Sequence, residues 1–337
     1  MPTCTTSSLS HKARLLGAAL TAALLAAALF SLCAGASGVS LWRGLGDALA
    51  GADTPAARII LYIRLPRTLA AVFSGAALAC AGAIIQGVLH NPLAGPNIIG
   101  VNAGAGFMTL LVSCLWPAAA GLVPLAAFMG ALAAAMIILA LAGRMGASRI
   151  TVVLAGVAIS AMLSAGSDLI TTLQPEATLG MSAFMIGGFS GVTASRLAAA
   201  IAYIAPALIL ALFTAGDLDV LGLGDEVAQS VGLRVRRVRV TQLMLACVLA
   251  GAAVSFSGLI GFVGLIVPHA IRRVTGGEHR ALLPLSILGG AVLMLFCDTI
   301  SRTLFAPYEV PVGILLSLLG GPFFLLLLMK NRRGGRA

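Results

Sequence analysis

The chain has 337 residues, of which 60% are hydrophobic and 9% are charged, and its mean hydropathy is +1.06. Because soluble domains carry about 25% charged residues, this composition excludes an ordinary soluble domain and predicts an all-α, polytopic membrane protein. The net charge of +10 does not indicate nucleic-acid binding, since the basic residues stand at the ends of apolar runs, as topology signals do. The 40 glycines suit close helix packing in lipid, and the six cysteines show no metal-binding spacing, so we expect core cysteines and no metal site.

The first apolar run is Leu15–Ser40, which follows a polar segment of 14 residues with a basic end. A cleaved signal peptide is one interpretation, with Ala34-Gly35-Ala36 as the cleavage site. The run is long for a signal peptide, however, and the rest of the chain is also apolar, so we favour an uncleaved first span. Trp42–Arg67 is interpreted as a polar connection.

The longest uncharged stretch follows, with 76 residues between Arg67 and Arg144. A span takes about 20 residues, so three spans fit here, with breaks at the proline-containing segments His90–Asn97 and Trp116–Pro124. A short basic loop then leads to a fifth span at Ile150–Leu173.

The Gly- and Ser-rich segment Gln174–Arg196 is expected to form a short re-entrant or surface helix, and Leu197–Ala215 is the sixth span. Val240–Ile271 is too long for one span and divides into the seventh and eighth near Gly258, Gly261 and Gly264. The ninth and tenth spans are predicted at Ala281–Leu304 and Pro311–Met329.

About ten spans place both termini on one side. That side then holds fifteen of the 21 Lys and Arg residues, and the other side holds six. The positive-inside rule therefore places both termini in the cytoplasm. In this prediction, residues 1–337 form one transmembrane domain with cytoplasmic segments at 1–14, 217–239 and 330–337.

The segment Asp217–Arg239 carries eight of the chain's 32 formal charges, so it cannot lie in hydrocarbon. Its middle reads as a helix of about seven residues. Asp225 is the expected N-cap, Glu226 suits the positive end of the helix dipole, and Gly232 is the expected stop. Val227, Ala228 and Val231 are expected to share one face. Because so short a helix is unstable alone, the protein or a partner must support it.

Catalytic and ion-coupling motifs are missing from the sequence. Asp168 and Asp298 are candidate intramembrane carboxylates, but both fall near predicted span ends, as does His269. Walker, HExxH, GxSxG and EF-hand patterns are absent, so nothing indicates that this chain is an enzyme.

Two clusters near span ends have alternative interpretations. Arg64 and Arg67, with Arg302 at the same level, are either anchors at the membrane interface or cationic contacts for acidic groups of a partner. The HNPLAGPN segment (His90–Asn97) is either a capped helix end or a constriction beside a pathway, with polar Asn91 and apolar Leu93 alternating.

Four blocks of sequence resemble the FecCD family, the permease subunits of ABC importers for iron–siderophore complexes, haem and cobalamin. They are RLPRTLAAVFSGAALACAGAIIQGVLHNPLAGPNIIGVNAGAG (64–106), LGDEVAQSVGL (223–233), GLIGFVGLIVPHAIRR (258–273) and DTISRTLFAPYEVPVGILLSLLGGPFF (298–324). Together they cover the chain from Arg64 to its end. In two places the chain departs from the family pattern. His90 stands where the family usually has Arg, and Gln174–Arg196 lacks a Trp often found there.

The resemblance implies ten helices per subunit, two permeases around a central pathway, two cytoplasmic ATPase subunits and a periplasmic binding protein. It implies ATPase coupling by a segment of nine residues, namely Gly224, Asp225, Glu226, Val227, Ala228, Gln229, Ser230, Val231 and Gly232. It also implies docking of the binding protein at Arg64, Arg67 and Arg302, and a cytoplasmic gate at Asn91 and Leu93. No cofactor is expected in this chain, since ATP and Mg belong to the partner ATPase.

These expectations describe a permease in the inner (cytoplasmic) membrane, either in a homodimer or paired with a different permease. Its expected cargo is a metal chelate, with a ferric siderophore as the first candidate and haem or cobalamin as alternatives. An ion-coupled secondary transporter is the first rival, although no midplane ion site is visible. A non-transporting scaffold or receptor is the second, and it leaves the inner and outer docking signals unexplained.

Overall fold

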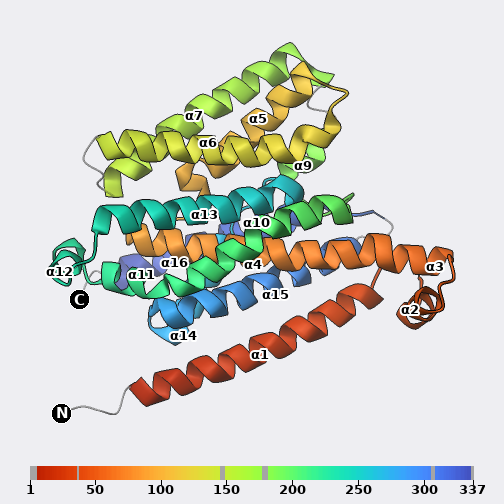
Figure 1. Ribbon diagram of the computed structural model, residues 1–337, viewed down its shortest axis with the longest axis horizontal. Helices are drawn as coiled ribbons and strands as arrows, with labels where there is room; N and C mark the ends of the chain where they lie inside the picture. The colour runs from red at the N-terminus through yellow and green to blue at the C-terminus, as the bar shows by residue number, and fades with distance from the viewer. Residues whose placement is uncertain (1–5, 36–37, 145–148, 177–180, 305–307, 335–337) are drawn as a thin grey trace.

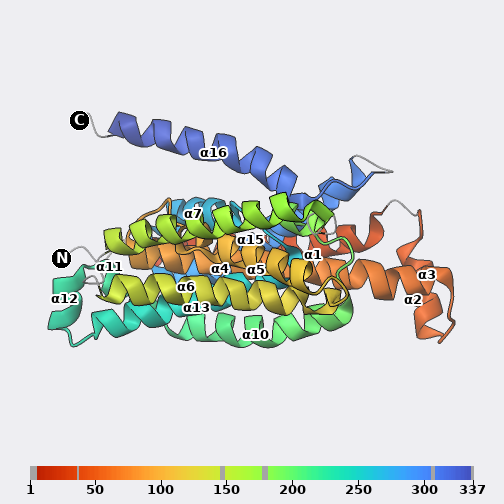
Figure 2. The same ribbon diagram turned by 90° about the horizontal axis from the view of Figure 1, so that it is seen from above.

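The computed structural model describes residues 6–35, 38–144, 149–176, 181–304 and 308–334. None of these residues forms a strand, and the long helices lie side by side in one bundle (Figures 1 and 2). This confirms the predicted all-α membrane-protein class.

The helices follow the chain in this order: α1 (Thr6–Cys33), α2 (Leu41–Leu49), α3 (Pro55–Arg58), η1 (Ile59–Arg64), α4 (Leu65–Leu89), η2 (Pro96–Ile99), α5 (Val101–Leu115), η3 (Ala120–Leu122), α6 (Val123–Arg144), α7 (Arg149–Leu173), α9 (Ser182–Ile186), α10 (Ala194–Phe213), α11 (Ala215–Gly222), α12 (Asp225–Ser230), α13 (Val235–Ser257), α14 (Val263–Thr275), α15 (His279–Thr303) and α16 (Val312–Gly334).

Each of the ten predicted spans coincides with a helix. Within the described residues, seven helices are long and apolar enough to cross a membrane. The remaining three are shorter as apolar helices: α5, the 13-residue α14, and the apolar part of α16 at Val312–Leu327. The number of helices that cross the membrane therefore stays a prediction. The predicted break between the seventh and eighth spans is confirmed, since α13 ends at Ser257 and α14 begins at Val263.

The interpretation of Trp42–Arg67 as a polar connection is wrong from Pro55 onward. Pro55–Leu89 is one continuous helical rod of 35 residues. It crosses Pro66, which has no backbone N–H to donate, and the turn before that proline is the π-helical segment η1, a common way to accommodate such a defect. The prediction took the arginines of this segment as a sign of a water-exposed connection. They instead have partners within the protein, as described below.

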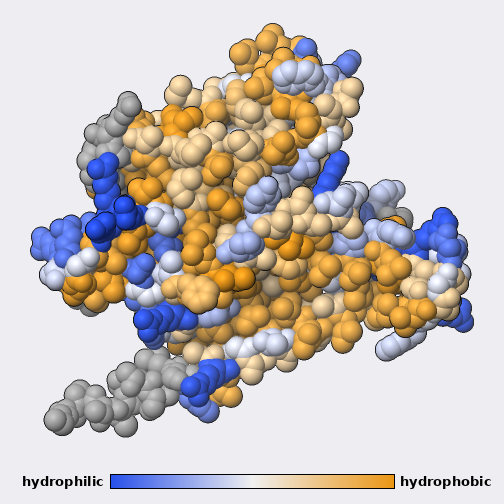
Figure 3. Space-filling model, viewed as in Figure 1, coloured by the Kyte–Doolittle hydropathy of each residue, from blue (hydrophilic) through white to orange (hydrophobic). Residues whose placement is uncertain are grey.

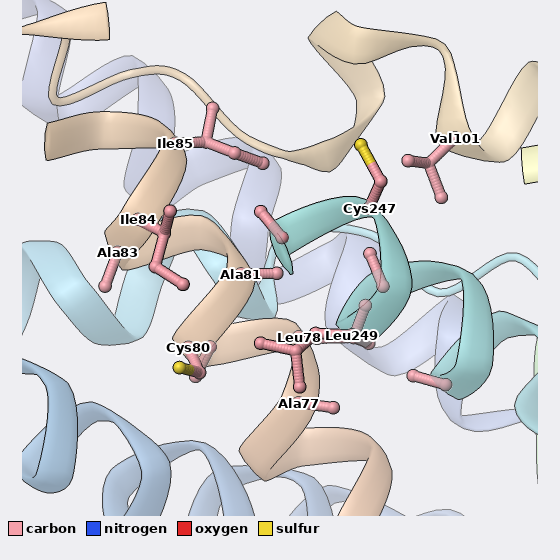
Figure 4. Close-up of a cluster of buried hydrophobic side chains, with 14 of the residues drawn as sticks. Ala77, Leu78, Cys80, Ala81, Ala83, Ile84, Ile85, Val101, Cys247 and Leu249 are labelled. Carbon is pink, nitrogen blue, oxygen red and sulfur yellow. The ribbon is translucent and has the colours of Figure 1, made fainter. Parts of the chain in front are cut away.

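Helix α4 lies at the centre of the bundle, and almost its whole length is buried. A Cβ added at Gly75 would lie 2.2 Å from the carbonyl oxygen of Gly290, and one at Gly82 would lie 1.9 Å from that of Gly264. Only glycine allows the backbones of α15 and α14 to approach α4 this closely. On another side α4 packs against α13, and side chains of the two helices lie together in the core (Figure 4).

The bundle has two ends, which we call the α12 end and the α2 end. In both ribbon views the start of α1 and the finish of α16 lie at the α12 end (Figures 1 and 2). Hydrophilic side chains gather mostly at these two ends, with a hydrophobic band between them (Figure 3). This distribution fits a bundle whose long axis crosses a bilayer.

The segment between α7 and α10 contacts the bundle through its middle, while its short helix α9 (Ser182–Ile186) has no buried residue. Phe189 is fully buried, and the N–H of Gly188 donates to the carbonyl of Ser257 at 2.8 Å. The N–H of Gly313, at the start of α16, donates to Gly187 at 3.1 Å. Whether this segment is re-entrant or lies at the surface stays a prediction.

Candidate functional site

Helix α12 forms a short projection at the α12 end of the bundle (Figure 1). Positive φ angles at Gly224 (105°) and Gly232 (86°) allow the chain to turn sharply at both sides of it, so the predicted stop at Gly232 is confirmed. Asp225 is not the N-cap, because the cap is Gly224 and Asp225 is the first helical residue. Its carboxylate pairs with Arg239 instead of capping the helix, and Nη2 of Arg239 donates to both carboxylate oxygens at 2.9 and 2.8 Å.

The predicted shared face of Val227, Ala228 and Val231 is wrong in one respect. Ala228 is fully buried against the bundle, whereas Val227 is 46% and Val231 is 66% exposed. Leu223, which lies between α11 and α12, is 67% exposed. We call Leu223, Val227 and Val231 the α12 apolar stripe. Three exposed aliphatic side chains on a projecting loop at a water-facing end are typical of a docking surface for another protein.

A second connection ties the chain before α12 to the bundle. Asp219 of α11 accepts a hydrogen bond from the backbone N–H of His279, the first residue of α15, and its Oδ1 lies 2.9 Å from His279 Nδ1. The N–H of Arg280 donates to the other carboxylate oxygen at 3.4 Å. This acidic cap suits the positive end of α15, and it joins α11 to a helix 60 residues further along the chain. Sequence reasoning missed this link, since nothing local marks the pair.

The end of α4 is a capped helix end, as one of the two interpretations predicted. His90 adopts a left-handed conformation (φ 49°), and its Nε2 lies 3.0 Å from the carbonyl oxygen of Leu221. The side chain of Asn91 accepts a hydrogen bond from the N–H of Leu93 at 2.9 Å. Both predicted gate residues are partly buried. Their role in a constriction stays a prediction.

Arg64, Arg67 and Arg302 lie near the α2 end and are only 3%, 8% and 4% exposed. Arg64 donates to the carbonyls of Leu32 and Cys33 at 2.7 and 3.0 Å. These carbonyls belong to the last turn of α1, which has no helical partner for them. The interpretation as anchors at the membrane interface is wrong, because the guanidinium groups are buried in protein.

Asp298 is the fully buried centre of this cluster. It accepts hydrogen bonds from Nε and Nη2 of Arg67 at 3.1 and 3.0 Å, and Nε of Arg302 lies 3.5 Å away. Arg302 also donates to Ser31, and Arg67 donates to the half-exposed Glu309 at 2.7 Å. The cluster joins α1, α4 and α15 with the segment before α16. Sequence reasoning placed the three arginines at one level but missed their acidic partner.

The described residues contain no group of three or more His, Cys, Asp or Glu side chains that could hold a metal ion. Cys80, Cys247 and Cys297 are buried, as predicted for core residues, whereas Cys33 is exposed and Cys114 is partly buried. Cys4 lies outside the described residues.

Comparison with known proteins gives consistent results. The family model described as "FecCD transport family" matches residues 23–330. The chain is 43% identical over 280 residues to the hemin transport system permease protein HmuU of Yersinia pestis, covering 81% of this chain and 84% of that protein. It is 38% identical over 315 residues to the Fe(3+) dicitrate transport system permease protein FecD of Escherichia coli, covering 93% and 98%.

A solved structure described as an inward-facing conformation of a metal-chelate type ABC transporter superposes with a TM-score of 0.81 at 29% identity. The superposition covers 94% of this chain and 99% of the other. The fold of the described helices is therefore that of an ABC permease.

Proposed function

The chain belongs to the FecCD transport family, and on this basis we propose that it is the permease subunit of an ATP-driven importer of a metal chelate, with a ferric siderophore as cargo. ATP hydrolysis takes place in a partner subunit, because this family consists of transport permeases. The periplasmic binding protein delivers the cargo, and this chain supplies the path through the membrane.

We place the protein in the inner membrane with the α12 end in the cytoplasm. The charge distribution supports this orientation, since fifteen of the 21 Lys and Arg residues fall in the segments assigned to that side. The start of α1 and the finish of α16 also lie at that end (Figure 2). Nucleotide is available there.

The observation that carries the proposal is the α12 apolar stripe. Leu223, Val227 and Val231 are exposed to water at the α12 end, and burying them in a groove of an ATPase would remove apolar surface from water. Ala228 and the Asp225–Arg239 ion pair fix the back of α12 to the protein, so that movement of a docked partner is transmitted to α13. The coupling segment is Gly224–Gly232.

A second copy of the chain is proposed to complete the pathway. Two helices support this, since α16 packs mainly against α14 and α15 and touches α9 only near its start, and α7 is mostly unburied. Both expose large aliphatic side chains, among them Leu154 on α7 and Leu318 on α16. The two copies would flank one central path, with Asn91 and Leu93 of each at its cytoplasmic end.

The binding protein is proposed to dock at the α2 end, around Arg64, Arg67 and Arg302. These guanidinium groups already donate hydrogen bonds to acceptors within the protein. The binding protein would therefore contact the surface whose residues the arginines hold in place, which includes Glu309 and the end of α1. Complementary charges on the two proteins would then contribute to the specificity of docking more than to its affinity.

The class of transporter is tested by gentle purification from the native membrane with mass spectrometry of stoichiometric partners. We expect one Walker-motif ATPase per permease and a co-isolated binding protein. Recovery of this chain alone from several mild detergents, with uptake driven by an ion gradient, would replace the proposal with a secondary transporter.

The coupling segment is tested by Glu226→Arg, with Glu278→Arg as the matched control. Both glutamates are exposed, lie at the start of a helix and sit at the α12 end, so the two variants make the same charge change in similar surroundings. We expect Glu226→Arg to abolish uptake and to release the ATPase on purification. Glu278→Arg should retain both. Equal behaviour of the two variants, at equal membrane levels, contradicts coupling through α12.

Haem is the second candidate cargo, because a hemin permease is among the most similar relatives. The two cargoes are separated by measuring uptake of a radiolabelled ferric siderophore and of haem in proteoliposomes containing the complete complex. Uptake of haem alone would reassign the cargo within the same class of transporter.

A further inference from the structure

A hollow of about 380 Å³ with a mixed polar and apolar lining lies between α7, the start of α5 and α9 (Ser182–Ile186). Its polar lining consists of six side chains, namely Asn97, Asn102, Ser160, Ser164, Ser167 and Asp168. The four on α7 follow the spacing of one helix face. Met185 and Leu259 supply part of its apolar lining. No Lys, Arg or His contributes to this lining among the described residues.

Close backbone packing fixes the orientation of this face. A Cβ at Gly156 would lie 1.8 Å from the carbonyl oxygen of Ile98, and one at Gly166 would lie 2.7 Å from the ring of Phe107. These two glycines therefore let α7 pack directly against η2 and α5. One close contact precedes Ser160 along the helix and the other follows Ser164. Helix α7 cannot rotate about its axis without losing both close contacts, so the orientation of its polar face is fixed by the fold.

Two side chains of the hollow have polar groups without protein partners. Asp168 is exposed, and its carboxylate makes no hydrogen bond or ion pair with any described residue. It lies five residues, or about 7.5 Å, inside the end of α7. The Oγ of Ser160 is buried and also lacks a hydrogen-bond partner. A carboxylate facing lipid at this depth would be costly, so this face meets water or a polar ligand.

Given the proposed function, we propose that this hollow is a cargo-binding wall of the translocation path, and that it accepts an electroneutral or cationic chelate with hydrogen-bonding groups on its surface. The hydroxyl and amide groups match the amide and hydroxyl groups of hydroxamate-type chelates. Asp168 repels a carboxylate, and the hollow offers no cation to compensate it. Chelates with free carboxylates, such as ferric dicitrate and haem, fit this wall poorly.

Water access and charge are tested first, without any cargo. Ser164→Cys is placed in a complex whose Cys4, Cys33 and Cys114 are replaced by serine, and is treated with cationic and anionic methanethiosulfonate reagents. Met162→Cys is the control, because Met162 is 69% exposed on the opposite face of α7. We expect Ser164→Cys to react at least tenfold faster than the control. Asn102→Cys gives a second reporter on α5 in case Ser164→Cys does not assemble.

Adding Asp168→Asn to Ser164→Cys should lower the ratio of cationic to anionic reaction rates about tenfold. A unit charge about 6 Å away, screened as in water, has this effect on two reagents of opposite sign. An unreactive cysteine at both positions, or a rate ratio that Asp168→Asn leaves unchanged, overturns the inference.

The cargo class is tested with two probes labelled with radioactive iron, an electroneutral ferric tris-hydroxamate and ferric dicitrate, offered to the reconstituted complex with its binding protein. We expect the hydroxamate probe to be carried at least tenfold faster, and Asp168→Lys to lower its uptake about tenfold, because a donor replaces a charged acceptor. Faster uptake of dicitrate by the natural protein, or uptake raised by Asp168→Lys, overturns the cargo assignment.

Glu226→Arg and Glu278→Arg are measured in the same reconstituted complexes. The results then distinguish failure of the proposed function from failure of the cargo-binding proposal. If Glu226→Arg and Glu278→Arg behave alike, the proposed function fails. If Glu226→Arg alone abolishes uptake and the thiol reactions do not follow the expected pattern, only the cargo-binding wall fails.

Discussion

Replacing Asp298 with asparagine should destabilise the protein strongly, because it removes a carboxylate that is fully buried between Arg67 and Arg302. Breaking a buried ion pair by removing one partner costs about 3–5 kcal/mol. Arg67 keeps its bond to Glu309, and Arg302 keeps the carbonyls of α1, so we expect the lower limit, about 3 kcal/mol. For a chain of 337 residues, that loss corresponds to a fall of about 4 °C in the apparent melting temperature.

The protein carries its own reporters for this measurement. Cys80, Cys247 and Cys297 are buried and become accessible to a thiol-reactive fluorophore on unfolding, while exposed Cys33 sets the baseline. Asp53→Asn is the control, because Asp53 pairs with Arg58 on the surface, where ion pairs contribute little.

Equal melting temperatures for Asp298→Asn, Asp53→Asn and the natural protein would refute the structural role of the cluster. In that case the arginines would be free to serve docking directly. A large fall confined to Asp298→Asn supports the assignment of these arginines to holding α1, α4 and α15 together.

Two further predictions follow from single contacts. Gly82→Val should prevent accumulation in the membrane, because its side chain would overlap the backbone of α14, whereas Gly46→Val, with open space around it, should accumulate normally in an immunoblot of membranes. Asp219→Ala should lower cargo uptake per ATP hydrolysed severalfold without releasing the ATPase, because α11 loses its link to His279. Asp217→Ala is the control, because Asp217 lies on the same helix but does not contact His279. Equal coupling ratios for the two variants would contradict the role of Asp219.

The sequence predicted the features that depend on neighbouring residues. Long uncharged runs, separated by proline or by basic loops, were enough to place a helix at each of the ten predicted spans. The break at Gly258–Gly264 and the stop at Gly232 are local backbone signals, and both were predicted. The family resemblance rests on continuous blocks, and the family match over residues 23–330 confirms it.

The errors of prediction arose where distant residues meet. Asp225 has the chemistry of an N-cap, but Arg239 of the next helix takes its carboxylate. Pro66 and the charges around it mark a connection by local rules, yet the rod continues through them because Arg67 finds Asp298, 231 residues away. Local propensity is a preference of about 1 kcal/mol or less per residue, or about 3 kcal/mol at a proline inside a helix, and buried tertiary contacts of about 3–5 kcal/mol can exceed it.

Composition and the order of apolar runs thus determined that this protein is an all-helical membrane protein, because hydrocarbon admits few other solutions. Tertiary structure decided which side chains remain available for function. It buried the three arginines and Ala228, and it left the α12 apolar stripe exposed. Through Gly156 and Gly166, α7 packs closely on η2 and α5, and this packing points Asp168 into the hollow, a placement set by contacts between helices that no local pattern encodes.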